Sequence, residues 1–370
     1  MNKADGERSR LFGRRQPTRR RASSVGGDVD GSSVCFFVCL ALAVAFVVLL
    51  FFAIASRRGP SEQPVADRSY DDGRFLVHKG QLYSSSFALY FENEDSEPIS
   101  PWHDIATTDA TGFYNMVVEM PRWSNARMRV QVNSELNPIK QDSASDGTLK
   151  FVPNIFPYRG VLWNSGSMPQ TWSDPGVPDQ LTKVAGNNRP LEVLEIGTTV
   201  KSRGEVVQLK VLGALASVEE GRTFWKLIGV DAMEPVARLI DDIADIEAHM
   251  PGLLQATADW CTLEPVAAGG PAAKLALDGR FQNKTIATLV IRRLHHQWRQ
   301  LLKGERNDTM TGRLRLEHTT SGGSRWLLSA SAAKEVVESA APFLADAAFV
   351  DPSANEWSFV NRGDRGPGKY

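Results

Sequence analysis

Residues 185–197 read Ala-Gly-Asn-Asn-Arg-Pro-Leu-Glu-Val-Leu-Glu-Ile-Gly, and this stretch decides the fold. Apolar residues dominate the C-terminal end of the stretch, Val193–Ile196, which is expected to be a strand. The polar residues Asn187, Arg189 and Glu192 come just before that strand. Of these three, only Glu192 carries a carboxylate. Arginine is always cationic and has no acceptor atom, so Arg189 cannot ligate a metal ion.

The stretch resembles the metal-binding signature of the soluble family I inorganic pyrophosphatases, G-D-x-D-P-[IL]-D-V-x-E-I-G. In that family the three aspartates hold divalent metals. Other segments resemble the eukaryotic members in the same order along the chain: residues 98–105, 113–126, 137–142, 169–175, 204–212, 219–226, 295–301 and, more weakly, 355–360. The resemblance implies the family's α+β fold, a closed or nearly closed antiparallel β-barrel (OB-like) flanked by two long helices.

The pattern of the chain favours the same fold. Short alternating segments between turn residues, among them 114–119 and 206–216, predict strands of a closed sheet. Apolar residues recur at helical spacing from Val236 to Ile246 and predict one helix there. A second helix is predicted over residues 287–302, ending at Gly304.

When the family's active-site residues are placed one by one on this sequence, the resemblance also implies an active site. Glu119 and Lys226 keep catalytic residues of the family, whereas Arg127 replaces a lysine and Lys150 replaces an arginine. The family's acidic metal-ligand positions are occupied here, in chain order, by Glu119, Arg129, Asn187, Arg189, Glu192, Glu219 and Phe224. Only the three glutamates retain a carboxylate, so the resemblance implies a degraded metal site in which Glu192 and Glu219 are the remaining metal ligands.

The family reaction is hydrolysis of pyrophosphate to two phosphates with Mg²⁺ as the implied cofactor. Mg²⁺ needs oxygen ligands at ~2.0–2.1 Å in near-octahedral geometry, and the bound metals activate the attacking water. Guanidinium groups at ligand positions repel cations. We therefore expect an impaired or inactive copy of the enzyme, in which no metal need be retained and which has a scaffold or assembly role.

Two other functions stay open. One is an active, divergent pyrophosphatase, which the family resemblance alone predicts. The other is a sensor that binds phosphate or pyrophosphate without metal, because the arginine fork suits phosphate oxygens. The cations available for such binding are Arg127, Arg129, Lys150, Arg189 and Lys226. Alternatively, these cations form plain salt bridges with the remaining glutamates in an abandoned site.

The N-terminal part of the chain has a different composition. Residues 1–33 form a basic tail, and residues 34–55 are apolar and long enough for a transmembrane helix of ~20 residues. Residues 56–74 predict a stalk, 75–360 the pyrophosphatase-like domain, and 361–370 a flexible C-terminus. The positive-inside rule places the tail in the cytosol and the domain across a single-pass membrane anchor. An organelle membrane, for example mitochondrial, is the alternative.

Charge and cysteine content limit the partners. The formal net charge is −1 over 370 residues, so we expect no nucleic-acid partner. Arg122 and Trp123 lie in a segment that contributes to the dimer contact of eukaryotic members, so the resemblance implies a homodimer. Cys261 is the only cysteine of the domain, so no disulfide is expected within it.

Overall fold

The structure is a computed structural model, and it describes residues 68–71, 74–306, 313–320 and 323–360. All of these belong to one compact unit, Pro64–Tyr370. The predicted basic tail, the predicted transmembrane helix, most of the stalk and the predicted flexible C-terminus lie outside the described residues.

The prediction of a single-pass membrane protein is not retained. In the part of the chain that the structure describes, no helix has the length and apolar character needed to cross a membrane. The segment expected to do so, residues 34–55, lies outside the described ranges. Neither the localisation nor the membrane as a partner has structural support.

Fifteen strands are present in the described residues, and they form three sheets. The first sheet has the order β1 (Arg68–Asp71), β2 (Arg74–Lys79), β3 (Ala88–Glu92), β7 (Ile139–Gln141), β6 (Met128–Val130), with β4 (Pro98–Ile99) paired to β3. The second contains β5 (Tyr114–Met120), β9 (Asn164–Met168), β10 (Leu191–Glu195), β11 (Val206–Glu219), β12 (Arg222–Asp231), β13 (Lys274–Leu275) and β14 (Gln282–Asn283). The third joins β8 (Asn154–Ile155) to β15 (Trp357–Ser358).

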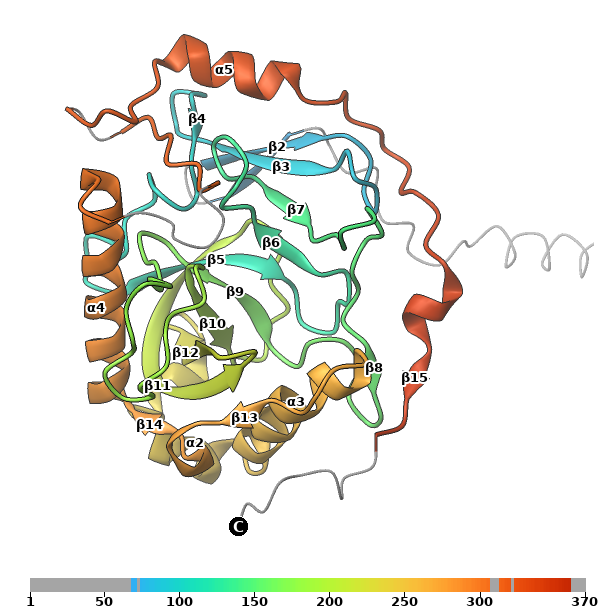
Figure 1. The fold of residues 1–370 in the computed structure, drawn as a ribbon, viewed down its shortest axis with the longest axis vertical. Helices are drawn as coiled ribbons and strands as arrows, with labels where there is room; N and C mark the ends of the chain where they lie inside the picture. Colours follow the sequence, from blue (N-terminus) through green and yellow to red (C-terminus); the bar gives the residue numbers. More distant parts are fainter. Residues whose placement is uncertain (1–67, 72–73, 307–312, 321–322, 361–370) are drawn as a thin grey trace, which may run out of the picture. The chain divides into compact units, whose positions relative to one another are not determined.

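Five strands of the second sheet close into a ring. β11 pairs with β5 on one side and with β12 on the other, and the circuit continues through β10 and β9 back to β5. The α+β class is therefore confirmed, with a ring of strands at its centre (Figure 1). One detail differs from the antiparallel barrel that we expected: β10 and β12 are parallel. The β11–β12 hairpin returns the chain beside β10 in the same direction.

The four α-helices of the described residues are α2 (Ile243–His249), α3 (Leu253–Ala267), α4 (Lys284–Lys303) and α5 (Ala330–Ser339). The short 3₁₀ helices are η1 (Pro235–Arg238), η2 (Leu277–Gly279) and η3 (Pro352–Asn355). The helix predicted over 287–302 is confirmed as α4, which ends at Gly304 with φ 73°. The single helix predicted from Val236 to Ile246 is wrong. It is split into η1 and α2, because extended Asp242 forms a capping box with Asp245 and starts a new helix.

Helix α4 covers one face of the ring. Its buried residues Val290, Ile291 and Leu294 pack with Val207 and Leu209 of β11 in one apolar cluster. Burial of each such side chain contributes about 1.5–3 kcal/mol relative to exposure. This packing fixes β11, and through its pairing with β5 and β12 it holds the strands that carry the candidate site.

Candidate functional site

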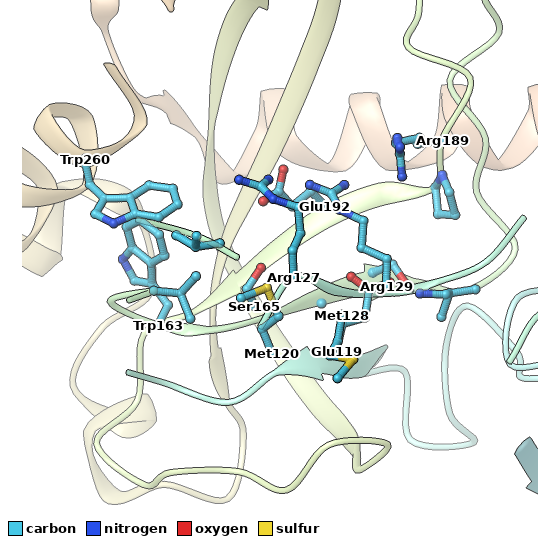
Figure 2. A pocket seen from close by; sticks show the side chains of 16 residues that line it. Glu119, Met120, Arg127, Met128, Arg129, Trp163, Ser165, Arg189, Glu192 and Trp260 are labelled. Atoms are coloured by element: carbon cyan, nitrogen blue, oxygen red, sulfur yellow. Dashed lines mark hydrogen bonds between the residues drawn. The ribbon is translucent and has the colours of Figure 1, made fainter. Parts of the chain in front are cut away.

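A cavity of about 50 Å³ is lined by residues of β5, β6, β9 and β10, with one residue from α3. Figure 2 shows its two ends. Arg129, Arg189 and Glu119 gather at one end, whereas Trp163 and Trp260 form the other. Five of the residues that the sequence singled out line the cavity: Glu119, Arg127, Arg129, Arg189 and Glu192.

Glu119 lies on β5 and is 9% exposed. Its Oε1 accepts a hydrogen bond of 2.9 Å from the backbone N–H of Val130. Burial raises the pKa of Glu119 to about 7, although the charge of Arg129 and the Ser167 side chain act in the opposite direction. This carboxyl group therefore keeps its proton to a higher pH than an exposed glutamate does.

Arg129, on β6, is held by a neighbouring carboxylate. Its Nε lies 3.2 Å from Oδ2 of Asp142, whose other oxygen accepts a hydrogen bond of 2.9 Å from Gln131. Burial opposes the charge of Arg129, but Asp142, Glu192 and Glu119 outweigh it and raise the pKa of the guanidinium. Arg129 is a fixed cation at all accessible pH values.

Arg189 lies in the loop that leads into β10. Its backbone N–H donates to Oδ1 of Asn187 at 3.0 Å, a local turn typical of asparagine, and Pro190 then restricts the chain. The charge of Arg129, followed by burial, lowers the pKa of the Arg189 guanidinium. Among the described residues, no hydrogen bond or salt bridge reaches this guanidinium. Two cations therefore face the cavity together, and only Arg129 has a bonded acid.

Glu192 and Lys226 are paired through the parallel strands. They are register partners on β10 and β12, and Nζ of Lys226 donates to Oε2 of Glu192 at 2.8 Å. Burial opposes ionisation of Glu192, but Lys226 and then Arg129 outweigh it and lower its pKa. The pair is thus a partly buried salt bridge, in which the Lys226 side chain is 10% exposed and the Glu192 side chain 25%.

Arg127 lies between the two ends of the cavity (Figure 2). Its backbone is fixed on both sides, because its N–H donates to the carbonyl of Lys150 and its carbonyl accepts from Asp142. Its guanidinium forms a short salt bridge with Glu264 of α3. The side chains of this pair are 20% and 14% exposed.

The other predicted site residues do not line the cavity. Lys150 is exposed and contributes only its backbone to Arg127. Glu219 accepts a hydrogen bond of 2.7 Å from Ser217, and its charge acts on Lys226 from outside the cavity. The ring of Phe224 lies 5.7 Å from Nζ of Lys226.

Three residues at the cavity were not among the predicted site residues. Trp163 and Trp260 line it, and Glu264 pairs with Arg127. Nothing in one sequence marks Glu264 as the partner of Arg127, because the two are 137 positions apart. Their proximity depends on how α3 packs against the ring.

The described residues do not fit the family's metal ions. They contain no group of three or more His, Cys, Asp or Glu side chains that could hold a metal. Glu119 accepts from a backbone amide, Glu192 from Lys226, and Asp142 lies against Arg129. Arg129 and Arg189 place positive charge where Mg²⁺ would need oxygen ligands.

The family model described as inorganic pyrophosphatase matches residues 116–299. The chain is 37% identical to the inorganic pyrophosphatase of Drosophila melanogaster over 287 residues, which cover 77% of this chain and 83% of that protein. It is similar to the solved inorganic pyrophosphatase from Schistosoma japonicum, with a TM-score of 0.71 and 35% identity over 77% of this chain and 100% of that one. It is also similar to a truncated vacuolar soluble pyrophosphatase from Trypanosoma cruzi, solved in complex with PPi, with a TM-score of 0.57 and 30% identity over 66% and 95%. This chain belongs to the inorganic pyrophosphatase family.

Proposed function

We propose that this chain binds pyrophosphate or phosphate at the Arg129–Arg189 end of the cavity without a metal cluster, and that it hydrolyses pyrophosphate more slowly than its relatives do. The observation that carries the proposal is the pair of guanidiniums. The charge of Arg129 is the largest cause of the lowered pKa of Arg189, and no bonded acid offsets it among the described residues. A phosphate oxygen placed between the two cations would relieve their repulsion.

The electrostatic energies favour a site occupied by an oxyanion over an empty site. Two like charges ~4 Å apart cost about 1 kcal/mol in water and about 4 kcal/mol at an effective dielectric of ~20. Charge-assisted hydrogen bonds to a bound phosphate, each worth about 1.5–3 kcal/mol, would offset this repulsion and stabilise the complex. Arginine also presents its donors in a planar fork that matches two oxygens of one phosphoryl group.

A working inorganic pyrophosphatase is the second candidate. The comparisons favour it over a loss of hydrolysis, because relatives named inorganic pyrophosphatase match three quarters of the chain at 37–38% identity. The carboxylates of Glu119, Asp142, Glu192 and Glu219 would have to support such a site after rearrangement. The salt bridges of Asp142 and Glu192 would then break when metal enters.

Phosphate release from pyrophosphate separates the two candidates. The full-length chain is assayed with Mg²⁺ and then Mn²⁺, beside an active family member and a Glu119→Gln variant. A rate far below that of the active family member, together with measurable pyrophosphate binding in the absence of metal, supports the first function. A rate near that of the active enzyme, abolished by Glu119→Gln, establishes the second.

We also propose a homodimer, and no nucleic-acid partner. Support for the dimer comes from large aromatic side chains that the monomer leaves exposed, Trp123 at 56%, Phe156 at 57% and Trp357 at 44%. Exposed aromatic residues are typical of protein–protein contacts.

A further inference from the structure

We infer that Glu264 is a specificity-determining residue: it pairs with Arg127 as an internal counter-ion, so that the cavity binds one phosphoryl group well and weakens the binding of a second. This inference rests on the proposed function. The pairing of Glu264 with Arg127 divides the cations of the site into two groups. The first is Arg129 with Arg189, and the second is Arg127, which is already paired.

The geometry of α3 brings Glu264 to the cavity. Trp260 and Glu264 are four positions apart on this helix and therefore share a face. Trp260 lines the cavity, so Glu264 projects from the same side, one turn further along, and reaches Arg127. The backbone of Arg127 is held by hydrogen bonds on both sides. Glu264 and a ligand therefore compete for its side chain alone.

The charges around the cavity are arranged for one phosphoryl group. Arg129 and Arg189 lie at one end, whereas Arg127 is already paired with Glu264. A diphosphate needs the charge of Arg127 as well. While Arg127 is bound to Glu264, a second phosphoryl group would meet a carboxylate, and like charges repel.

Burial makes Glu264 an effective competitor. The side chains of the pair are 20% and 14% exposed, so solvent screens their attraction only in part. An incoming phosphoryl oxygen must displace this carboxylate and leave it beside the newly bound anion. By contrast, the guanidinium of Arg189 has no bonded acid to displace among the described residues.

The test compares phosphate with pyrophosphate by calorimetric titration in EDTA, using the full-length chain, Glu264→Gln and Glu335→Gln. Glu335 is an exposed acid on α5 and controls for the loss of one negative charge. We expect Glu264→Gln to tighten pyrophosphate binding by about tenfold or more, the worth of one added charge-assisted hydrogen bond. Phosphate binding should change by less than about threefold, as charge loss without a new contact gives only a small gain. Arg127→Gln added to Glu264→Gln should remove the gain.

The outcomes separate this inference from the proposed function. Suppose that the wild type binds at least one anion, and that Glu264→Gln either tightens the binding of phosphate and pyrophosphate equally or tightens neither. The role of Glu264 is then overturned, while the proposed function stands. If wild type binds neither anion but Glu264→Gln binds pyrophosphate, Glu264 is the competitor and the wild-type function is wrong. If no variant binds either anion, both are overturned. Should Glu264→Gln fail to fold, Glu264→Asp, which shortens the reach to Arg127, must shift selectivity in the same direction.

Discussion

Replacing Arg189 with glutamine should stabilise the ligand-free protein and at the same time remove its response to phosphate. Most substitutions of partly buried residues destabilise a protein. Arg189 differs because its guanidinium faces Arg129 and has no bonded acid among the described residues. Glutamine keeps much of the side chain's length and removes the charge.

The expected gain follows from the causes of the lowered pKa. Repulsion by Arg129 is the largest, ahead of burial, whereas Asp142 and Glu119 attract Arg189 and offset part of it. Two like charges ~4 Å apart repel by about 1 kcal/mol in water and by about 4 kcal/mol at an effective dielectric of ~20. Because nearby acids offset part of the repulsion between Arg129 and Arg189, we expect a gain at the low end, about 1 kcal/mol. For a domain of this size, 1 kcal/mol raises Tm by about 2–4 °C.

Thermal unfolding of the full-length chain in low salt, with and without phosphate, measures both effects. Phosphate at ~100 times its Kd should stabilise wild type by about 2.7 kcal/mol and leave Arg189→Gln unchanged. Arg280→Gln removes an exposed arginine and should behave like wild type. A lower Tm for Arg189→Gln, with the response to phosphate kept, would show instead that the guanidinium is a structural group that does not bind the anion.

Three further predictions follow from the same region and its surface. Lys226→Met should cost about 3 kcal/mol in urea unfolding, because it leaves the Glu192 carboxylate buried without its 2.8 Å partner; a loss below ~1 kcal/mol would contradict a structural pair. Burial raises the pKa of Glu119 from ~4.3 in the unfolded chain to about 7, so the folded state holds an extra proton between these values. Its contribution to stability should fall by about 3 kcal/mol as pH rises from ~4.5 to 7, and Glu119→Gln should remove that slope in urea titrations at several pH values. Light scattering should give a dimer mass for the full chain, and Trp123→Ala, which removes an exposed ring, should shift it toward the monomer without changing Tm at low concentration.

Local sequence patterns predicted the elements that local chemistry controls. Helix α4 ends at Gly304 as expected, because a glycine accepts the left-handed conformation there at no steric cost. The strand within residues 185–197 was also expected, and it is observed as β10. The prediction of one helix over 236–246 was wrong because Asp242 and Asp245 form a helix cap in the middle of this segment. The apolar pattern continues on both sides of the cap and so does not reveal it.

The parts that were not predicted depend on tertiary structure. The parallel pairing that sets Glu192 opposite Lys226 follows from the path of the β11–β12 hairpin, which periodicity does not encode. The partner of Arg127 depends on how α3 is rotated against the ring. Lys150 was expected at the site because the resemblance places it where the family has an arginine, but its side chain is exposed to solvent.

A calorimetric titration of the full-length chain with pyrophosphate in EDTA, repeated in Mg²⁺, tests the central claim most directly. The Arg129–Arg189 pair predicts binding in EDTA that weakens with added salt and is lost in Arg189→Gln. Binding seen only with Mg²⁺, and unaffected by Arg189→Gln, would contradict the claim. The cavity would then be a rearranged metal site of the kind that the family resemblance alone implies.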